Sequence, residues 1–176
     1  MASSSNLLVF VSVAILLQLR LGFTSATSTK YINDICNRVR NSTFCFKTLN
    51  SYPPAVAATN KYQAAQAVLH LGESHALKTL SFIEKVAMMR SNLKQFKACQ
   101  DVYKYIAMSF HVPTSLLKEA PDSANYDIMV CYDQTTIVNN LIGKNRDVAS
   151  KKVMTMTMKM DVFINLADIA TTVIGW

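Results

Sequence analysis

Four long segments of this 176-residue chain place apolar residues three and four positions apart, and few helix breakers interrupt them. Steps of three and four follow the period of a buried helix face. The four prolines and Gly143 fall outside or between these segments, where they separate one helix from the next. No segment alternates apolar and polar residues, so the pattern predicts helices and no sheet.

The first stripe, in 60–90, and the second, which begins at Asn92, are Ala65, Leu69, Gly72, Ala76, Leu80, Ile83 and Ala87, then Leu93, Phe96, Cys99, Tyr103, Ile106 and Phe110. The third, capped by Asp122 or Ser123, and the fourth, in 148–174, are Ala124, Ile128, Cys131, Thr135, Val138 and Ile142, then Val153, Met156, Met160, Phe163, Ala167, Ala170 and Ile174.

These stripes predict an all-α protein in which residues 59–174 form an up-down-up-down four-helix bundle. Two shorter helices, in 31–39 and 44–51, precede the bundle and form an α-hairpin within residues 27–54. Residues 111–121 are expected to be a loop, because a proline lies near each end of that stretch.

Residues 1–26 read as a signal peptide. An apolar run from Leu7 to Leu19 is too short to span a bilayer comfortably, and Thr24-Ser25-Ala26 resembles a cleavage site. An uncleaved anchor is the alternative. We expect secretion, a mature chain of residues 27–176 with a net charge of about +6, and no membrane association after cleavage. The basic residues are scattered and form no stripe, which argues against a nucleic-acid partner.

All four cysteines, Cys36, Cys45, Cys99 and Cys131, lie in the mature region. A secreted chain with an even number of cysteines and no C-x-x-C pair favours disulfides over a metal site. A Cys36–Cys45 bridge would close a short loop and stabilise a hairpin that has little core of its own. Asn41-Ser42-Thr43 lies between them and forms a sequon, so we expect Asn41 to be exposed and glycosylated.

The sequence contains no pattern typical of catalysis. His70 and His75 point in different directions on one helix, and three glutamates are too few for a di-iron bundle. Glycine loops and nucleophile motifs are missing. Four methionines between Met154 and Met160 are interpreted as core filling, with a ligand groove as the alternative. We therefore expect no enzyme activity, no metal and no cofactor, which leaves binding.

Several short motifs resemble one family. Tyr31-Ile32 precedes Cys36, eight residues separate Cys36 from Cys45, and Cys99-Gln-Asp-Val-Tyr103 is similar to the family's Cys-x-x-Leu-Tyr. Asp133 is similar to an exposed polar residue of the third bundle helix. Together these features resemble the plant invertase and pectin methylesterase inhibitors, secreted four-helix bundles with an N-terminal α-hairpin.

The resemblance implies a second bridge, but one cysteine is displaced. The family pattern places the fourth cysteine at Val138, whereas this chain has Cys131, seven residues earlier. Seven residues keep the helical face but move the sulfur about 10.5 Å along the axis. Either the third helix is shifted, or Cys99 and Cys131 are not bonded. We expect the bridge to form through a shifted helix.

The resemblance also implies an extracellular partner enzyme. Family members meet pectin methylesterase with a face of the bundle helices, and meet invertase with the turn between the last two helices, often through Pro-Lys-Phe. Residues 143–147 read Gly-Lys-Asn-Arg-Asp, without that motif. We therefore expect a one-to-one complex with a pectin methylesterase in the apoplast or cell wall, with acid invertase as the alternative target. Candidate contact residues are Lys97, Lys104, Asp133 and Gln134.

Two other hypotheses remain open at this point. One is a small secreted carrier that holds an apolar ligand within the methionine-rich bundle, which would need a cavity of a few hundred Å3. The other is a divergent family member that has lost inhibition and serves a structural or storage role.

Overall fold

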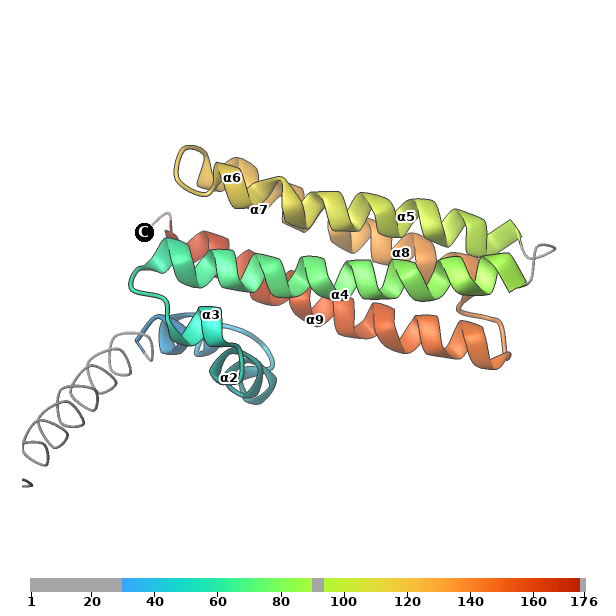
Figure 1. Cartoon of the computed structure of the whole chain (residues 1–176), viewed down its shortest axis with the longest axis horizontal. Coiled ribbons are helices and arrows are strands. Elements are labelled where there is room, and N and C mark those ends of the chain that lie inside the picture. The colour runs from blue at the N-terminus through green and yellow to red at the C-terminus, as the bar shows by residue number, and fades with distance from the viewer. Residues whose placement is uncertain (1–29, 90–93, 175–176) are drawn as a thin grey trace, which may run out of the picture.

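A computed structural model of the chain describes residues 30–89 and 94–174, and every regular element in those residues is a helix (Figure 1). The predicted signal peptide at 1–26 and the expected helix start at Asn92 lie outside the described residues. The bundle consists of α4 (Lys61–Met89), α5 (Lys94–His111), α7 (Pro121–Met129) with α8 (Cys131–Ile142), and α9 (Val148–Ile174). The predicted all-α bundle with an N-terminal hairpin is confirmed.

The predicted stripes form the core. On α5 the residues from Phe96 to Phe110 in the second stripe are all buried, and so is every member of the third stripe. On the two longest helices the buried face shifts by one position in places. Thr79 and Val86 are buried on α4 where Leu80 and Ala87 were expected, and Thr157 is buried on α9 instead of Met156. A 27- or 29-residue helix contacts several neighbours along its length, so one stripe does not describe its whole buried surface.

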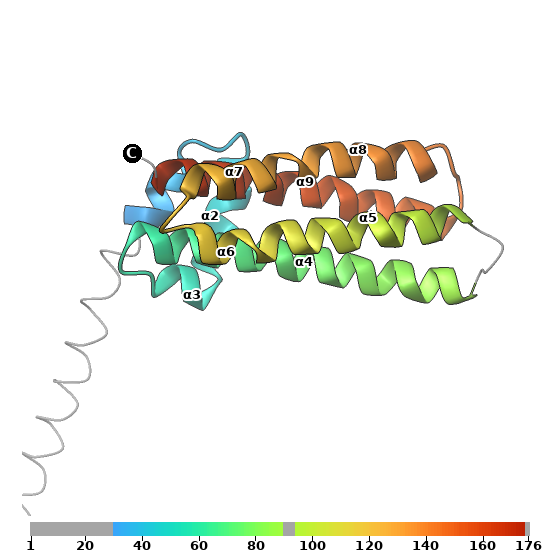
Figure 2. The same cartoon turned by 90° about the horizontal axis from the view of Figure 1, so that it is seen from above.

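The third bundle helix is interrupted at Val130, where a single continuous helix was expected. The amide of Asp133 donates to the Val130 carbonyl at 3.1 Å, an i to i+3 bond, and the amide of Gln134 reaches the same carbonyl at 3.4 Å. An i to i+3 hydrogen bond is typical of a local 3₁₀ turn. The chain continues beyond this turn as a helix in about the same direction. α7 and α8 therefore act together as one arm of the bundle (Figure 2).

The expected loop at 111–121 contains one further turn of helix, α6 (Pro113–Leu116). Pro113 stands in the first turn, where its missing N–H costs no hydrogen bond. The proline that predicted a break here instead begins a short helix, so the loop prediction was wrong for these four residues. α6 lies beside the start of α4 (Figure 2).

Gly72 sets how closely α4 approaches α5. A Cβ built on Gly72 would overlap the ring of Phe110, and that ring is fully buried. The absence of a side chain at this position therefore lets the two helices pack with an aromatic ring between them. At the next residue of each helix, His111 Nδ1 and Glu73 Oε1 lie 2.9 Å apart and join the two helices as well.

The N-terminal hairpin lies outside the bundle on the side of α4 and α9 (Figure 1). It comprises a helix at 30–36, α2 (Ser42–Asn50) and the short α3 (Pro53–Val56). Ile32, Ile35 and Leu49 are almost fully buried and belong to the same hydrophobic core as the bundle. The hairpin is therefore attached to the bundle by apolar packing.

Candidate partner-binding surface and cysteine sites

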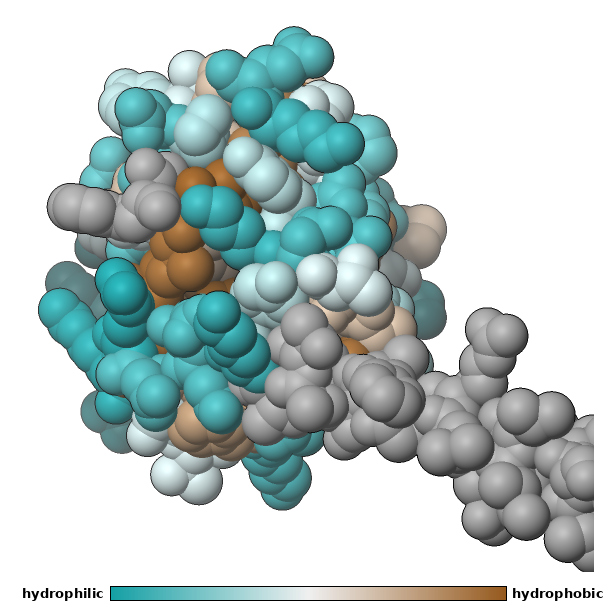
Figure 3. Space-filling model, turned by 90° about the vertical axis from the view of Figure 1, so that its left-hand side faces the viewer, coloured by the Kyte–Doolittle hydropathy of each residue, from teal (hydrophilic) through white to brown (hydrophobic). Residues whose placement is uncertain are grey.

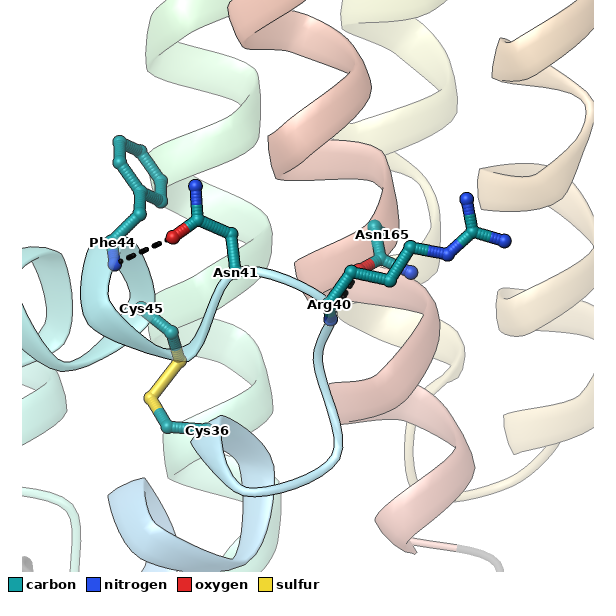
Figure 4. The surroundings of a disulfide bond; sticks show 6 residues. All are labelled: Cys36, Arg40, Asn41, Phe44, Cys45 and Asn165. Carbon is teal, nitrogen blue, oxygen red and sulfur yellow. Dashed lines mark hydrogen bonds between the residues drawn. A yellow bond between two sulfur atoms is a disulfide. The ribbon is translucent and has the colours of Figure 1, made fainter.

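The predicted disulfide closes the N-terminal hairpin. Cys36 and Cys45 form a disulfide with Cα atoms 5.4 Å apart, and both cysteines are buried (Figure 4). Asn41 begins α2, and its Oδ1 accepts a hydrogen bond of 3.0 Å from the amide of Phe44. Arg40 then ties the connection to α9, since its backbone amide donates to Asn165 Oδ1 at 3.4 Å. The bridge thus fixes a turn that also contacts the bundle.

Cys99 and Cys131 are both buried free thiols, so the bridge that we expected between them is absent. Cys131 lies against Ser109, whose hydroxyl hydrogen-bonds to its sulfur. Ten residues of α5 separate Ser109 from Cys99, which corresponds to about 15 Å along the helix. Bridged Cα atoms lie within about 7 Å of each other. The two cysteines share the inward direction but lie at different levels of the bundle, and the expected shift of the third helix does not occur.

Burial makes both thiols unreactive. Removal from water raises the pKa of the Cys99 thiol to about 11 and that of the Cys131 thiol to about 12. The thiolate is the reactive form, and burial disfavours charge. The Cys131 Sγ also donates to the Asp127 carbonyl at 3.6 Å. Both residues therefore serve as small apolar core residues.

The four predicted contact residues are divided between two helices and do not form one cluster of interactions. Lys97 on α5 donates to Gln100 Oε1 at 3.2 Å, and the Gln100 side chain donates to Glu84 of α4 at 3.1 Å. Lys97 therefore lies on the edge of α5 that faces α4. Helical spacing places Lys104 on the same edge, where it pairs with Asp101 at 3.9 Å. The other two residues, Asp133 and Gln134, lie on α8.

α5 and α8 adjoin in the bundle (Figure 2), and each helix carries exposed apolar residues. Because Ser109 lies beside Cys131, Tyr105 is level with residues near 135, between Gln134 and Ile137. Tyr105 is 46% exposed and Ile137 is 42% exposed. Met108, one turn along α5, is 64% exposed. We call Tyr105, Met108, Gln134, Ile137 and the adjacent Asp133 the α5/α8 face.

Asp133 and Gln134, which the sequence suggested as contact residues, belong to this candidate face, whereas its apolar members were not among the predicted residues. One signal was available in the sequence: Tyr105, Met108 and Ile137 are large apolar residues that fall outside every inward stripe. A scattered exposed apolar residue is ordinary on a protein surface. Three that are exposed on two adjoining helices are more informative about binding.

The turn between α8 and α9 is polar and is stabilised by hydrogen bonds among its own residues. Asp147 accepts from the Ser150 amide at 3.0 Å and from its hydroxyl at 2.6 Å, and so caps the start of α9. Asn145 adds a bond of 3.2 Å to the same hydroxyl. Lys144 and Arg146 remain exposed. The turn presents two cations on a tightly capped backbone.

The remaining titratable groups of the described residues include His75, which is partly buried, and a His–Glu–His arrangement at the surface. Burial lowers the pKa of His75, whose Nε2 lies 2.9 Å from the Met156 carbonyl, while Lys159 and Lys78 lower it further. Glu73 lies between His111 and His70, the latter at 3.5 Å. Within the described residues, no three His, Cys, Asp or Glu side chains are grouped closely enough to hold a metal ion.

A family model described as plant invertase/pectin methylesterase inhibitor matches residues 30–172 of the chain. This chain belongs to that family. Its members are inhibitors of other enzymes, so the protein is an inhibitor of the pectinesterase and invertase kind and not an enzyme. No curated protein matches the chain significantly.

The inhibitor's fold is also that of a solved family member. A crystal structure of a mutant form of a pectin methylesterase inhibitor from Arabidopsis superposes with a TM-score of 0.67 at 20% sequence identity. The match covers 80% of this chain and 95% of the other. In the described part of the inhibitor, no helix is sufficiently long and apolar to cross a membrane. Its two inner cysteines, Cys99 and Cys131, are unpaired.

Proposed function

We propose that this protein inhibits a pectin methylesterase by docking its α5/α8 face over the enzyme's substrate cleft in a one-to-one complex. The observation that carries the proposal is the exposure of Tyr105, Met108 and Ile137 on two adjoining helices. Aromatic residues and methionine are enriched in the buried centres of protein interfaces. Because both helices are packed on the core, binding would require little ordering of the face.

The polar residues beside the apolar part of the α5/α8 face would help to orient the partner enzyme. Asp133 is exposed beside the apolar residues, and Gln134 is half-buried next to it. Polar groups at the rim of an interface contribute more to partner choice and association rate than to affinity. Lys104 precedes Met108 by four residues on α5, so it borders the face on the side of Met108.

The α8–α9 turn favours pectin methylesterase over invertase as the target. The resemblance gives the turn the role of entering the active site of invertase, often with Pro-Lys-Phe. Here Asp147 and Asn145 are engaged in capping α9, and no aromatic residue projects from residues 143–147. The exposed apolar residues that a partner could bury lie on the helices.

A ligand-carrier function is less well supported. An apolar groove of about 330 Å3 opens between α4 and α9, lined by Phe82, Val86, Met89, Val148, Ala149 and Lys152. None of the four methionines between Met154 and Met160 lines this groove. Met160 is buried in the core and Met154 packs against it, whereas Met158 is 66% exposed, so core filling describes only part of this cluster.

We further propose that the inhibitor acts outside the cell and carries a glycan on Asn41. The Asn41 Oδ1 is used by the α2 cap, whereas its Nδ2, the atom to which a glycan attaches, points away from α2 (Figure 4). The hairpin lies on the α4 and α9 side of the bundle, away from α5 and α8 (Figure 1). A glycan there would leave the α5/α8 face free.

The face is tested by removing its apolar side chains one at a time. Tyr105→Ala and Ile137→Ala should each raise the inhibition constant against a pectin methylesterase by about tenfold or more, as expected for anchors at an interface centre. Leu77→Ala is the matched control, because Leu77 is 48% exposed on α4. It should leave inhibition unchanged. Equal effects at all three positions, or none, would contradict the proposed face.

A further inference from the structure

A polar cavity of about 340 Å3 lies between the start of α4 and α6. Apart from Leu117, every lining residue is polar: three amides, three hydroxyls and one ammonium, from Asn60, Gln63, Gln66, Tyr62, Thr114, Ser115 and Lys118. It opens at the end of the bundle that also holds the hairpin, where mostly hydrophilic residues are exposed (Figure 3). Its size is at the lower end of the range of about 300–1,000 Å3 for small-molecule sites.

The amide groups in this cavity offer donors. Asn60 Oδ1 accepts from the Gln63 amide at 2.9 Å. Gln63 Oε1 accepts from the Thr59 amide at 2.7 Å and from its hydroxyl at 2.9 Å. Both amide oxygens are therefore occupied, while the two NH₂ groups have no partner among the described residues. A side chain in this state can donate to a ligand without giving up a bond of its own.

The hydroxyl groups offer acceptors. Ser115 Oγ donates to the Val112 carbonyl at 2.8 Å, and Thr114 Oγ1 donates to the Phe110 carbonyl at 3.3 Å. Each hydroxyl has one hydrogen, so what remains available on each oxygen is its lone pairs. The cavity thus combines amide donors with hydroxyl acceptors.

The electrostatics of the cavity favour an anion. Lys118 supplies a positive charge, and no carboxylate lines the cavity. No salt bridge joins Lys118 to a carboxylate of the described residues. The beginning of the 29-residue helix α4 adds a partial positive charge from its first backbone N–H groups. The preferred ligand is therefore anionic at one point and rich in hydroxyl groups elsewhere.

We propose that this cavity binds an acidic sugar, a hexuronate whose carboxylate meets Lys118 and the amide donors and whose hydroxyls donate to Thr114 and Ser115. The choice of galacturonate among the hexuronates rests on the proposed function, since removal of methyl esters from pectin leaves free galacturonate. The cavity lies on α4 and α6, apart from the α5/α8 face. The inhibitor would thereby be held on de-esterified pectin while its inhibitory face remains available.

Binding is tested without any enzyme present. The purified protein is titrated calorimetrically with α-1,4-linked trigalacturonate, its methyl ester, an uncharged trisaccharide and inorganic phosphate, and the side-chain amide signals are followed by NMR. Saturable binding of trigalacturonate is expected, with shifts of the Asn60 and Gln63 NH₂ signals. The ester should bind about tenfold more weakly, because it lacks the charged hydrogen bond. Equal binding of acid and ester would overturn the proposal, and equal binding of phosphate would reduce the cavity to a general anion site.

A matched pair of lysine variants separates a site from diffuse attraction. Lys118→Gln should weaken trigalacturonate binding about tenfold. Lys85→Gln removes the same charge from the exposed surface about 36 Å along α4, and it should have no effect. Equal losses in the two variants would contradict a localised site. Inhibition of pectin methylesterase by Lys118→Gln should be unchanged, so failure of the sugar site and failure of the proposed inhibition are distinguishable.

Discussion

A single methyl group added at Gly72 tests how closely α4 and α5 pack. Replacement by alanine has two opposing effects on the free energy of unfolding. Alanine stabilises a helix interior by about 1 kcal/mol relative to glycine. The added methyl group, however, would overlap the Phe110 ring, which is fully buried and has no open space into which to move. Overpacking of this kind costs about 1–3 kcal/mol.

The packing cost should exceed the gain in helix propensity. We expect Gly72→Ala to lower the free energy of unfolding by up to about 2 kcal/mol, and to lower Tm by about 2–4 °C for each kcal/mol. Urea unfolding followed by circular dichroism, together with a thermal scan, measures both quantities. Ser74→Ala on the exposed side of the same helix is the control, and it should be neutral or slightly stabilising.

A second variant identifies the neighbour that causes the effect. Phe110→Leu removes ring atoms from the position that the new methyl group would occupy, at the cost of a cavity. In Gly72→Ala/Phe110→Leu the methyl group fills part of that space, so the double variant should be more stable than the sum of the two single costs predicts. A Gly72→Ala variant more stable than the wild type, or strictly additive effects, would refute the close approach of α4 to α5.

Three further predictions concern the cysteines and pH. With burial raising the thiol pKa values of Cys99 and Cys131 to about 11 and 12, iodoacetamide at pH 8 should label neither in the native protein and both after unfolding, as counted by mass spectrometry; rapid native labelling would show that they are accessible. Cys36→Ser/Cys45→Ser should lower the free energy of unfolding by about 2–3 kcal/mol. In that variant, backbone amides of the hairpin should exchange with solvent before those of α5. Uniform exchange would show that the hairpin does not unfold as a separate unit. Burial lowers the pKa of His75 below its unfolded value of 6.5, so the unfolded state binds the proton more readily. The free energy of unfolding should therefore be highest above about pH 6.5 and fall as the pH decreases below it. His75→Gln should flatten that decline, and an unchanged pH profile would exclude His75 as its source.

The bundle could be predicted from the sequence because helix burial is periodic. The third stripe, from Ala124 to Ile142, is buried at every predicted position, since a helix between two neighbours must turn one face inward. The interruption at Val130 and the single turn at Pro113 were not predictable. Each depends on one or two local hydrogen bonds that leave the apolar period unchanged.

The apolar stripes predict which way a side chain points, but they do not predict its level along the axis of the bundle. Cys99 and Cys131 both face inward, as predicted, but the direction of a side chain does not determine its level along the bundle. Contact with Ser109 fixes that level and keeps the two sulfurs apart. The apolar members of the α5/α8 face were missed for a related reason, because the level of Tyr105 relative to Ile137 depends on how the two helices are aligned.

Inhibition of a pectin methylesterase by this bundle can be measured in a paired titration. The purified protein is added in increasing amounts to a fixed concentration of one pectin methylesterase and, separately, of one acid invertase, with residual activity measured in each. We expect pectin methylesterase activity to fall to an endpoint at one inhibitor per enzyme while invertase activity stays unchanged. Inhibition of invertase with no effect on pectin methylesterase would contradict the proposed target and assign the inhibitory role to the α8–α9 turn.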